Sequence, residues 1–132
     1  MTLVNLIQLP KIEDPRGNLS VIEKDIIPFE IKRVYYLYDV PSGAERGGHS
    51  HKQQKEFLIA LSGSFDVILN DGKTEKTVTL NKPNQGLLIG TGIWRELKNF
   101  SSGAVCLVIA SDVFDENDYI RDFEEFLKFS NQ

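Results

Sequence analysis

The chain has 132 residues, 41% of them hydrophobic and 26% charged, which is the composition of one ordinary globular domain. Its formal net charge of -4 gives no overall attraction for nucleic acid or for an anionic membrane surface, so we expect neither as a partner. No apolar run approaches the length of a membrane span, and the first residues lack a signal pattern. Together with a single cysteine, Cys106, these features predict a cytoplasmic protein.

Short segments of β type recur along the first 112 residues, separated by glycine, proline and asparagine. We expect strands over residues 19–23, 31–40, 57–61, 65–69, 77–80, 86–89, 96–100 and 105–110. The turn Asn70-Asp71-Gly72 is a strong hairpin signal between two of them. Many short strands punctuated in this way indicate a sandwich or a barrel.

The last part of the chain has a different pattern. Tyr119, Ile120, Phe123 and Phe126 recur at helical spacing. The acidic residues around position 115 would suit the positive end of a helix dipole. We therefore predict one amphipathic helix over about residues 115–129, packed on the β body or on a partner subunit.

The most informative positions are Gly43, His49, His51, Glu56 and Gly63. Two histidines one residue apart point to the same side of a strand, and they are the only histidines in the chain. We predict that both imidazoles face one pocket. The spacing of the five positions matches the first sequence motif of the cupin superfamily, so this segment resembles a cupin. The resemblance implies a mainly β fold, a small double-stranded β-helix (jelly-roll) barrel over about residues 1–112.

Cupins commonly hold a metal ion with these two histidines, the glutamate and a third histidine from a second motif. The best match to that motif, residues 90–99, has Arg95 at the position of the third histidine. An arginine has no free lone pair and repels a divalent cation. We therefore predict a pocket with no metal and no other cofactor. A three-ligand site of His49, His51 and Glu56, in a metal-dependent cupin, is the alternative.

Without a metal, paired imidazoles suit a reaction that moves a hydrogen between neighbouring carbons, because their pKa lies near neutrality. Such a reaction needs a base for the carbon acid and hydrogen-bond donors that stabilise an enediolate. The sequence contains no evident motif for a redox cofactor and no evident covalent nucleophile.

Several segments carry a closer resemblance, and they are spread over the whole chain: residues 14–17, 29–36, 46–52, Trp94, 110–112 and 115–121. Over this length the chain resembles the sugar 3,4-ketoisomerases, WxcM-like members of the cupin superfamily that act on dTDP-4-keto-6-deoxyglucose. The resemblance implies a homodimeric, metal-independent isomerase. Its product would be a dTDP-3-keto-6-deoxyhexose for surface glycans such as lipopolysaccharide, and the closer likeness is to galacto-forming members.

The resemblance also implies catalytic residues. His49 and His51 would remove the C3 proton and return a proton to C4 through a 3,4-enediol(ate), with the two roles not assigned to one histidine or the other. Tyr35 would relay a hydroxyl proton. Arg95 stands where some family members have a histidine, so it would either stabilise the enediolate charge or point outward.

Further positions are candidates for binding the substrate. Arg16 matches a family arginine and would hold the keto oxygen or the diphosphate. Arg33 and Arg46 are candidates for the diphosphate, which suits bidentate guanidinium contacts. Trp94 would stack on the thymine or form a wall of the pocket. A non-catalytic cupin that only binds a nucleotide sugar is a further alternative to the isomerase.

Overall fold

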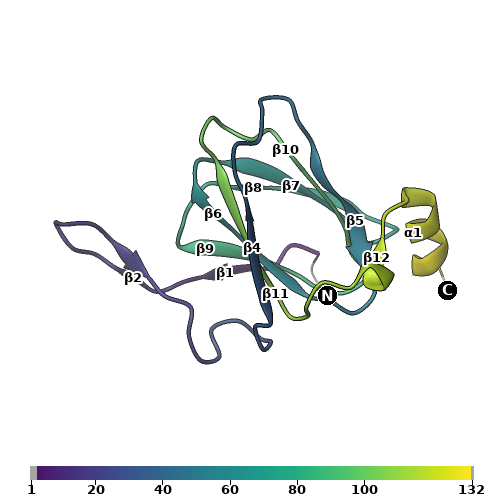
Figure 1. The fold of residues 1–132 in the computed structure, drawn as a ribbon, viewed down its shortest axis with the longest axis horizontal. Coiled ribbons are helices and arrows are strands. Elements are labelled where there is room, and N and C mark those ends of the chain that lie inside the picture. Colours follow the sequence, from purple (N-terminus) through teal and green to yellow (C-terminus); the bar gives the residue numbers. More distant parts are fainter. Residues whose placement is uncertain (1–2, 132) are drawn as a thin grey trace.

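Two five-stranded antiparallel sheets face each other in the computed structural model, which describes residues 3–131 (Figure 1). The first sheet has the order β1 (Leu6–Gln8), β9 (Gln85–Ile89), β6 (Glu56–Ser62), β11 (Val105–Ala110) and β4 (Arg33–Leu37). The second has the order β12 (Tyr119–Ile120), β5 (Arg46–His51), β10 (Trp94–Lys98), β7 (Phe65–Asn70) and β8 (Glu75–Leu80). This mainly β, jelly-roll arrangement confirms the predicted fold class.

The predicted strands agree with the structure best where apolar residues dominate. The strand over 105–110 has the predicted bounds, whereas the long segment 31–40 forms a strand only over Arg33–Leu37. The segment 19–23 contributes two residues, Leu19–Ser20, which form β3 and pair with β2 (Lys11–Ile12). Figure 1 shows this small hairpin projecting away from the sandwich.

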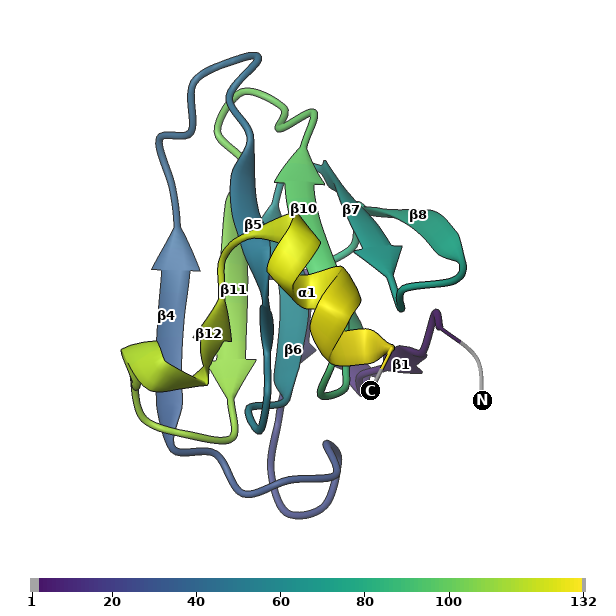
Figure 2. The same ribbon diagram turned by 90° about the vertical axis from the view of Figure 1, so that its right-hand side faces the viewer.

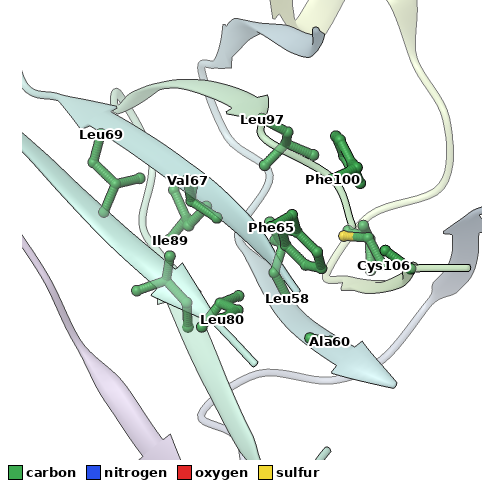
Figure 3. Close-up of a cluster of buried hydrophobic side chains, with 13 residues drawn as sticks. Leu58, Ala60, Phe65, Val67, Leu69, Leu80, Ile89, Leu97, Phe100 and Cys106 are labelled. Atoms are coloured by element: carbon green, nitrogen blue, oxygen red, sulfur yellow. The ribbon is translucent and has the colours of Figure 1, made fainter. Parts of the chain in front are cut away.

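The core lies between the two sheets and follows from the two-residue period of their strands. On β7, Phe65, Val67 and Leu69 point inward and are fully buried, while the residues between them are only partly buried. Figure 3 shows these side chains packed against those of the facing sheet, among them Leu58 and Cys106. Burial raises the pKa of the Cys106 thiol to about 12, as expected for a small core residue.

A second apolar cluster covers the outer face of the first sheet. Phe57, Ile59 and Ile109 point outward from their strands, and Leu9 and Ile27 from the N-terminal segment pack on them. Among residues 3–131, no helix combines the length and the apolar character that crossing a membrane requires.

The C-terminal segment differs from the predicted helix over 115–129. A short 3-10 turn, Glu116–Asp118, leads into β12, and helix α1 spans only Phe123–Ser130. The helix begins there because Tyr119 and Ile120 pair with β5 as a strand, and the side chain of Asp122 then caps the helix by accepting a hydrogen bond from the backbone N–H of Glu125. The local spacing of apolar residues gave no sign of this strand pairing.

Helix α1 covers the outer face of the second sheet, in front of β5 and β10 in Figure 2. Phe126 is fully buried and contacts Trp94 from β10, with ring centroids 5.7 Å apart. Ile120 completes this cluster. The helix therefore fixes β12 against the edge of the sheet.

The close packing of Phe57 generates a stability prediction. A Cβ atom at Gly86 would overlap the ring of Phe57, which is fully buried and has no room to move. Gly86→Ala should therefore lower the free energy of unfolding by roughly 1–3 kcal/mol, measured by urea denaturation. Gly90→Ala is the matched control, because no atom of residues 3–131 lies within 4 Å of a Cβ atom there. Equal unfolding midpoints for the two variants would contradict the packing argument.

Candidate active site

A cavity of about 370 Å³ opens between the sheets, a size suited to a small-molecule ligand. Strands of both sheets and the C-terminal segment line it. The lining residues are Arg33, Tyr35, Leu37, Arg46, Gly47, Gly48, His49, Glu56, Leu58, Arg95, Leu97, Val108, Tyr119 and Arg121.

The cavity adjoins the hydrophobic core, because inward-pointing residues of the same strands line the cavity and form the core. On β6, Glu56 shares its side with the buried core residue Leu58. On β4, Arg33 and Tyr35 share their side with Leu37, which packs against the core. The polar side chains of the site are therefore held on rigid strands and border a dry interior.

The two histidines lie side by side on β5. Their ring centroids are 4.8 Å apart and the ring planes are nearly perpendicular, at 84°. The two rings lie on the same side of β5, as the sequence predicted, but they do not have equal access to the cavity. His49 lines it, whereas His51 is fully buried and lies outside the set of lining residues.

Atom Nε2 of His49 is buried and has no hydrogen-bond partner among residues 3–131. Burial, followed by the positive charge of Arg95, lowers the pKa of His49 to about 3. The imidazole is therefore neutral at physiological pH, so one of its ring nitrogens carries a lone pair. A buried polar atom without a partner, on the wall of a cavity, indicates that a ligand supplies the missing contact.

A buried ion pair lies beside His49. Arg95 is the strand partner of His49 across β5 and β10, and its Nη1 donates a hydrogen bond to Oε1 of Glu56. Both side chains are 2% exposed. Two further guanidinium nitrogens of Arg95, Nε and Nη2, donate to the carbonyl oxygen of Ile93 at 3.2 and 2.9 Å. Arg95, which was predicted to bind substrate, thus lines the cavity, but most of its N–H donors already form hydrogen bonds within the protein.

The other carboxylate oxygen of Glu56, Oε2, accepts hydrogen bonds from the Tyr35 hydroxyl and from Nε2 of Gln54, each at 2.8 Å. Burial is the largest influence and would raise the pKa of Glu56, but Arg95, His51 and His49 together outweigh it and hold this pKa well below its usual range. Burial, and then the charge of Glu56, raise the pKa of Tyr35 above its usual value. Tyr35 therefore stays protonated and can donate.

His49, His51 and Glu56 offer ligand atoms that all lie within 4.8 Å of one another, the set considered above for a metal ion. These residues do not fit a divalent cation. The carboxylate of Glu56 already accepts hydrogen bonds from Arg95, Tyr35 and Gln54. A metal ion would have to displace these donors and lie next to a fixed guanidinium charge.

The remaining charges on the wall favour an anionic ligand. Atom Nη1 of Arg33 is buried and has no hydrogen-bond partner in the described part of the chain, and its guanidinium lies 4.4 Å from the centroid of the Tyr35 ring. Arg46 lines the same cavity and forms no ion pair within residues 3–131. Because Arg95 neutralises Glu56, these two arginines leave the wall positively charged.

Two residues predicted to bind substrate lie away from this cavity. Trp94 is next to Arg95 on β10 and therefore points to the opposite side of the sheet, where it is 5% exposed and packs under α1. Arg16 lies in the turn between β2 and β3, with its side chain 90% exposed and paired to Asp14. The prediction that Trp94 forms a wall of the pocket or stacks on the thymine is therefore corrected. The side chain of Arg16 does not reach the cavity of its own chain.

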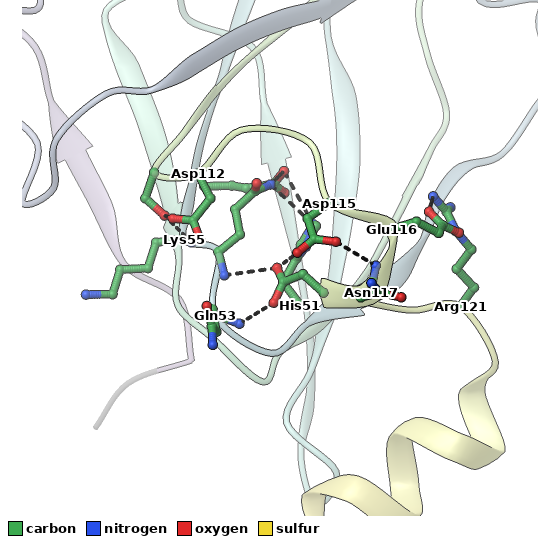
Figure 4. Close-up of polar contacts among 12 residues, drawn as sticks. His51, Gln53, Lys55, Asp112, Asp115, Glu116, Asn117 and Arg121 are labelled. Atoms are coloured by element: carbon green, nitrogen blue, oxygen red, sulfur yellow. Dashed lines mark hydrogen bonds and ion pairs between the residues drawn. The ribbon is translucent and has the colours of Figure 1, made fainter.

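Sequence reasoning missed the contribution of the C-terminal segment. The ring of Tyr119 lies 5.0 Å from that of His49 and 4.4 Å from that of His51. The guanidinium of Arg121 lies 4.1 Å from the Tyr119 ring and pairs with Glu116, as Figure 4 shows for the ion pair. The available signal was the pair Tyr119-Ile120, two β-forming residues between turn-forming acidic residues.

Comparison with known proteins shows the family of the chain. Residues 2–131 match the family described as "FdtA: WxcM-like, C-terminal". A TDP-4-oxo-6-deoxy-alpha-D-glucose-3,4-oxoisomerase from Aneurinibacillus thermoaerophilus is 46% identical over 125 residues, which are 94% of this chain and 90% of that protein. The chain belongs to the FdtA family.

Solved structures of 3,4-ketoisomerases have the same fold as this FdtA-family chain. A 3,4-ketoisomerase from Helicobacter canadensis is 47% identical, with 98% of each chain covered and a TM-score of 0.95. The TDP-quinovose 3,4-ketoisomerase WlaRB from Campylobacter jejuni is 48% identical, with 97% of this chain and 99% of that chain covered and a TM-score of 0.91. The FdtA-family chain is accordingly an isomerase of the TDP-sugar 3,4-ketoisomerase class.

A more distant neighbour shows how widely the fold is used. A dTDP-4-dehydrorhamnose 3,5-epimerase from Bacillus anthracis is 14% identical, with 88% of this chain and 76% of that chain covered and a TM-score of 0.78. This likeness concerns the fold alone.

The lowered pKa of His49 predicts a pH-dependent stability. The unfolded chain binds a proton on this ring near the ordinary pKa of 6.5, while the folded protein binds it only near 3. The free energy of unfolding should therefore be highest above pH 6.5 and decrease as the pH falls, by up to about 1.4 kcal/mol per pH unit between pH 6 and 5. Urea denaturation at pH 7, 6 and 5 measures this. His49→Asn should remove that part of the slope, and an unchanged slope would contradict the assignment.

Proposed function

We propose that this protein converts dTDP-4-keto-6-deoxyglucose into a dTDP-3-keto-6-deoxyhexose, in the biosynthesis of a deoxysugar. The observation that carries the proposal is the free Nε2 atom of the neutral His49, buried in the wall of a positively charged cavity. The relatives support the choice of ligand. Structures of the 3,4-ketoisomerase QdtA from Thermoanaerobacterium thermosaccharolyticum contain TDP or, in a variant, TDP-4-keto-6-deoxyglucose.

In the proposed reaction His49 is the general base that removes the proton from C3 of the sugar. The electron pair of that bond forms a double bond between C3 and C4, and the oxygen on C4 becomes an enediolate oxygen. A proton then returns to C4, and the hydroxyl proton on O3 is transferred to O4, so that C3 becomes the ketone and C4 carries the hydroxyl. Atoms and electrons balance within the sugar, because one keto and one hydroxyl group exchange places.

Neighbouring residues supply what a base alone does not. The guanidinium of Arg95, opposite His49 on the paired strand, provides positive charge for the enediolate. The protonated hydroxyl of Tyr35 lines the cavity and relays the protons of the sugar oxygens, while Glu56 fixes its direction at 2.8 Å. Arg33 and Arg46 bind the diphosphate with bidentate hydrogen bonds.

The product configuration at C4 is a finer question. The galacto configuration expected from the sequence remains a prediction, as does the cytoplasmic location. Campylobacter jejuni has a TDP-quinovose 3,4-ketoisomerase that is 48% identical to this chain and a TDP-fucose 3,4-ketoisomerase that is 34% identical. The coupling between H4 and H5 in the NMR spectrum of the product decides it, because a galacto product gives a small coupling and a gluco product a large one.

The main test compares the unmodified enzyme with His49→Asn on dTDP-4-keto-6-deoxyglucose. We expect the variant to lose at least about a hundredfold in kcat, because the general base is gone, while its affinity for TDP changes little. Product formation followed by NMR and TDP binding followed by calorimetry measure the two effects. Binding without conversion by the unmodified enzyme would favour a non-catalytic cupin instead. Loss of turnover in excess chelator would favour a metal-dependent enzyme.

We also propose a homodimer, built on two exposed apolar surfaces. Ile12 and Leu19 on the projecting hairpin are 58% and 54% exposed, and Val34 and Tyr36 on the outer face of the edge strand β4 are 53% and 59% exposed. If Arg16 binds substrate, it does so in the cavity of a second copy, because it lies at the hairpin turn outside its own chain's cavity.

Light scattering tests the dimer, with an expected mass of twice 14.9 kDa. The double variant Ile12→Glu/Leu19→Glu should shift the protein to a monomer, because the charges oppose burial of the hairpin. Val113→Glu is the control, since this residue is 63% exposed and lies outside both surfaces. A monomeric unmodified protein would contradict the proposal.

A further inference from the structure

We infer that Asp118 is a positioning residue for the reaction, because it fixes the tautomer and the ring orientation of His51, which lies against His49. This inference rests on the proposed function of His49 as the base. It concerns a residue of the C-terminal segment that touches neither the cavity nor the reacting atoms.

Asp118 binds four successive groups of the turn that follows β5. Its Oδ2 lies 3.0 Å from Nδ1 of His51, and its backbone oxygen accepts from the N–H of Lys52 at 3.0 Å. Its carboxylate also accepts the backbone N–H groups of Gln53 at 2.7 Å and Gln54 at 3.1 Å. Figure 4 shows His51 and Gln53 beside the loop that carries Asp115, with the dashed lines converging between them. One residue thus orders the whole turn, three of the four contacts being made by its side chain.

The contacts of the His51 ring are consistent with a single tautomer. A carboxylate only accepts hydrogen bonds, so Nδ1 of His51 must carry the proton that it shares with Asp118. On the other side of the ring, Nε2 lies 3.4 Å from Nε2 of Gln54. The amide of Gln54 has two hydrogens, of which one goes to Glu56 at 2.8 Å and the other points to His51.

The orientation of His51 is passed on to His49 by direct contact. The two rings meet edge to face, at 4.8 Å and 84°, so a tilt of the inner ring moves the outer one. Tyr119, the residue after Asp118, contacts both rings from β12. His49 therefore keeps its orientation in the cavity wall because Asp118 holds the ring behind it. A displacement of about 1 Å in such a group reduces turnover up to about a hundredfold.

The first test is the long-range proton–nitrogen NMR spectrum of the unmodified protein. The sequence contains only two histidines, so His49→Asn assigns the signals of His51 directly. We expect Nδ1 of His51 to carry a slowly exchanging proton. A spectrum with the proton on Nε2 alone would overturn the inference. This readout needs no turnover, so it fails or succeeds independently of the proposed reaction.

The second test separates positioning from simple support of the turn. Asp118→Ala removes the acceptor of His51, so we expect the Nδ1 proton signal to disappear and kcat to fall about ten- to a hundredfold with the affinity for TDP retained. Asp118→Asn keeps one side-chain oxygen. The Oδ2 position faces two donors, Nδ1 of His51 and the N–H of Gln54, whereas the Oδ1 position faces only the N–H of Gln53. We therefore expect the amide oxygen of the asparagine to take the Oδ2 position. This variant should keep the Nδ1 proton and most of the turnover while its melting temperature falls.

Asp115→Ala is the matched control, because Asp115 lies three residues earlier and, among residues 3–131, its side chain accepts only from the backbone N–H of Asn117. Its backbone oxygen, which alanine keeps, accepts from the N–H of Asp118. Its turnover should stay within about twofold of that of the unmodified enzyme. An unchanged kcat in Asp118→Ala would overturn the inference. The inference would also be overturned if the loss of kcat were proportional to the loss of melting temperature in all three variants. If Asp118→Ala does not fold, loss of the Nδ1 proton in Asp118→Asn with full turnover would overturn it as well.

Discussion

The buried ion pair between Glu56 and Arg95 is the interaction on which the site depends. Removing one partner would leave an uncompensated charge in the interior, at a cost of about 3–5 kcal/mol. The pair also sets the protonation of its neighbours. The charge of Arg95 adds to burial in keeping His49 neutral, and the carboxylate of Glu56 holds the Tyr35 hydroxyl as a donor. A fixed cation thus stands at the sequence position where the cupin motif has its third histidine.

The site and the core are built from the same faces of the same strands. On β6 the inward positions run from the carboxylate of Glu56 to Leu58 and Ala60 in the middle of the apolar cluster. This arrangement has an electrostatic consequence, because charges bordering a dry interior interact more strongly than charges in water. The functional side chains on β4 and β6 also have strand neighbours that pack in the core.

The C-terminal segment completes the site from the far end of the chain. Its short strand β12 pairs with β5, so that Tyr119 lies over the histidines and Asp118 holds the turn beneath them. Helix α1 then secures this strand by burying Phe126 against Trp94. The apolar stripe of the tail therefore serves packing, as the sequence predicted, while Asp118 in the acidic turn before it accepts hydrogen bonds from the turn that follows the histidines.

The sequence by itself determined the β architecture, the strand that carries His49 and His51, and the chemical conflict between Arg95 and a metal, because these follow from local spacing and side-chain chemistry. It could not determine that Trp94 packs under a helix, or that residues 119–120 pair as a strand. Both depend on which distant segment lies alongside, and apolar residues at helical spacing are compatible with either outcome. Only the tertiary structure decided which of the two imidazoles reaches the cavity, since its boundary is formed by side chains from both sheets and the tail.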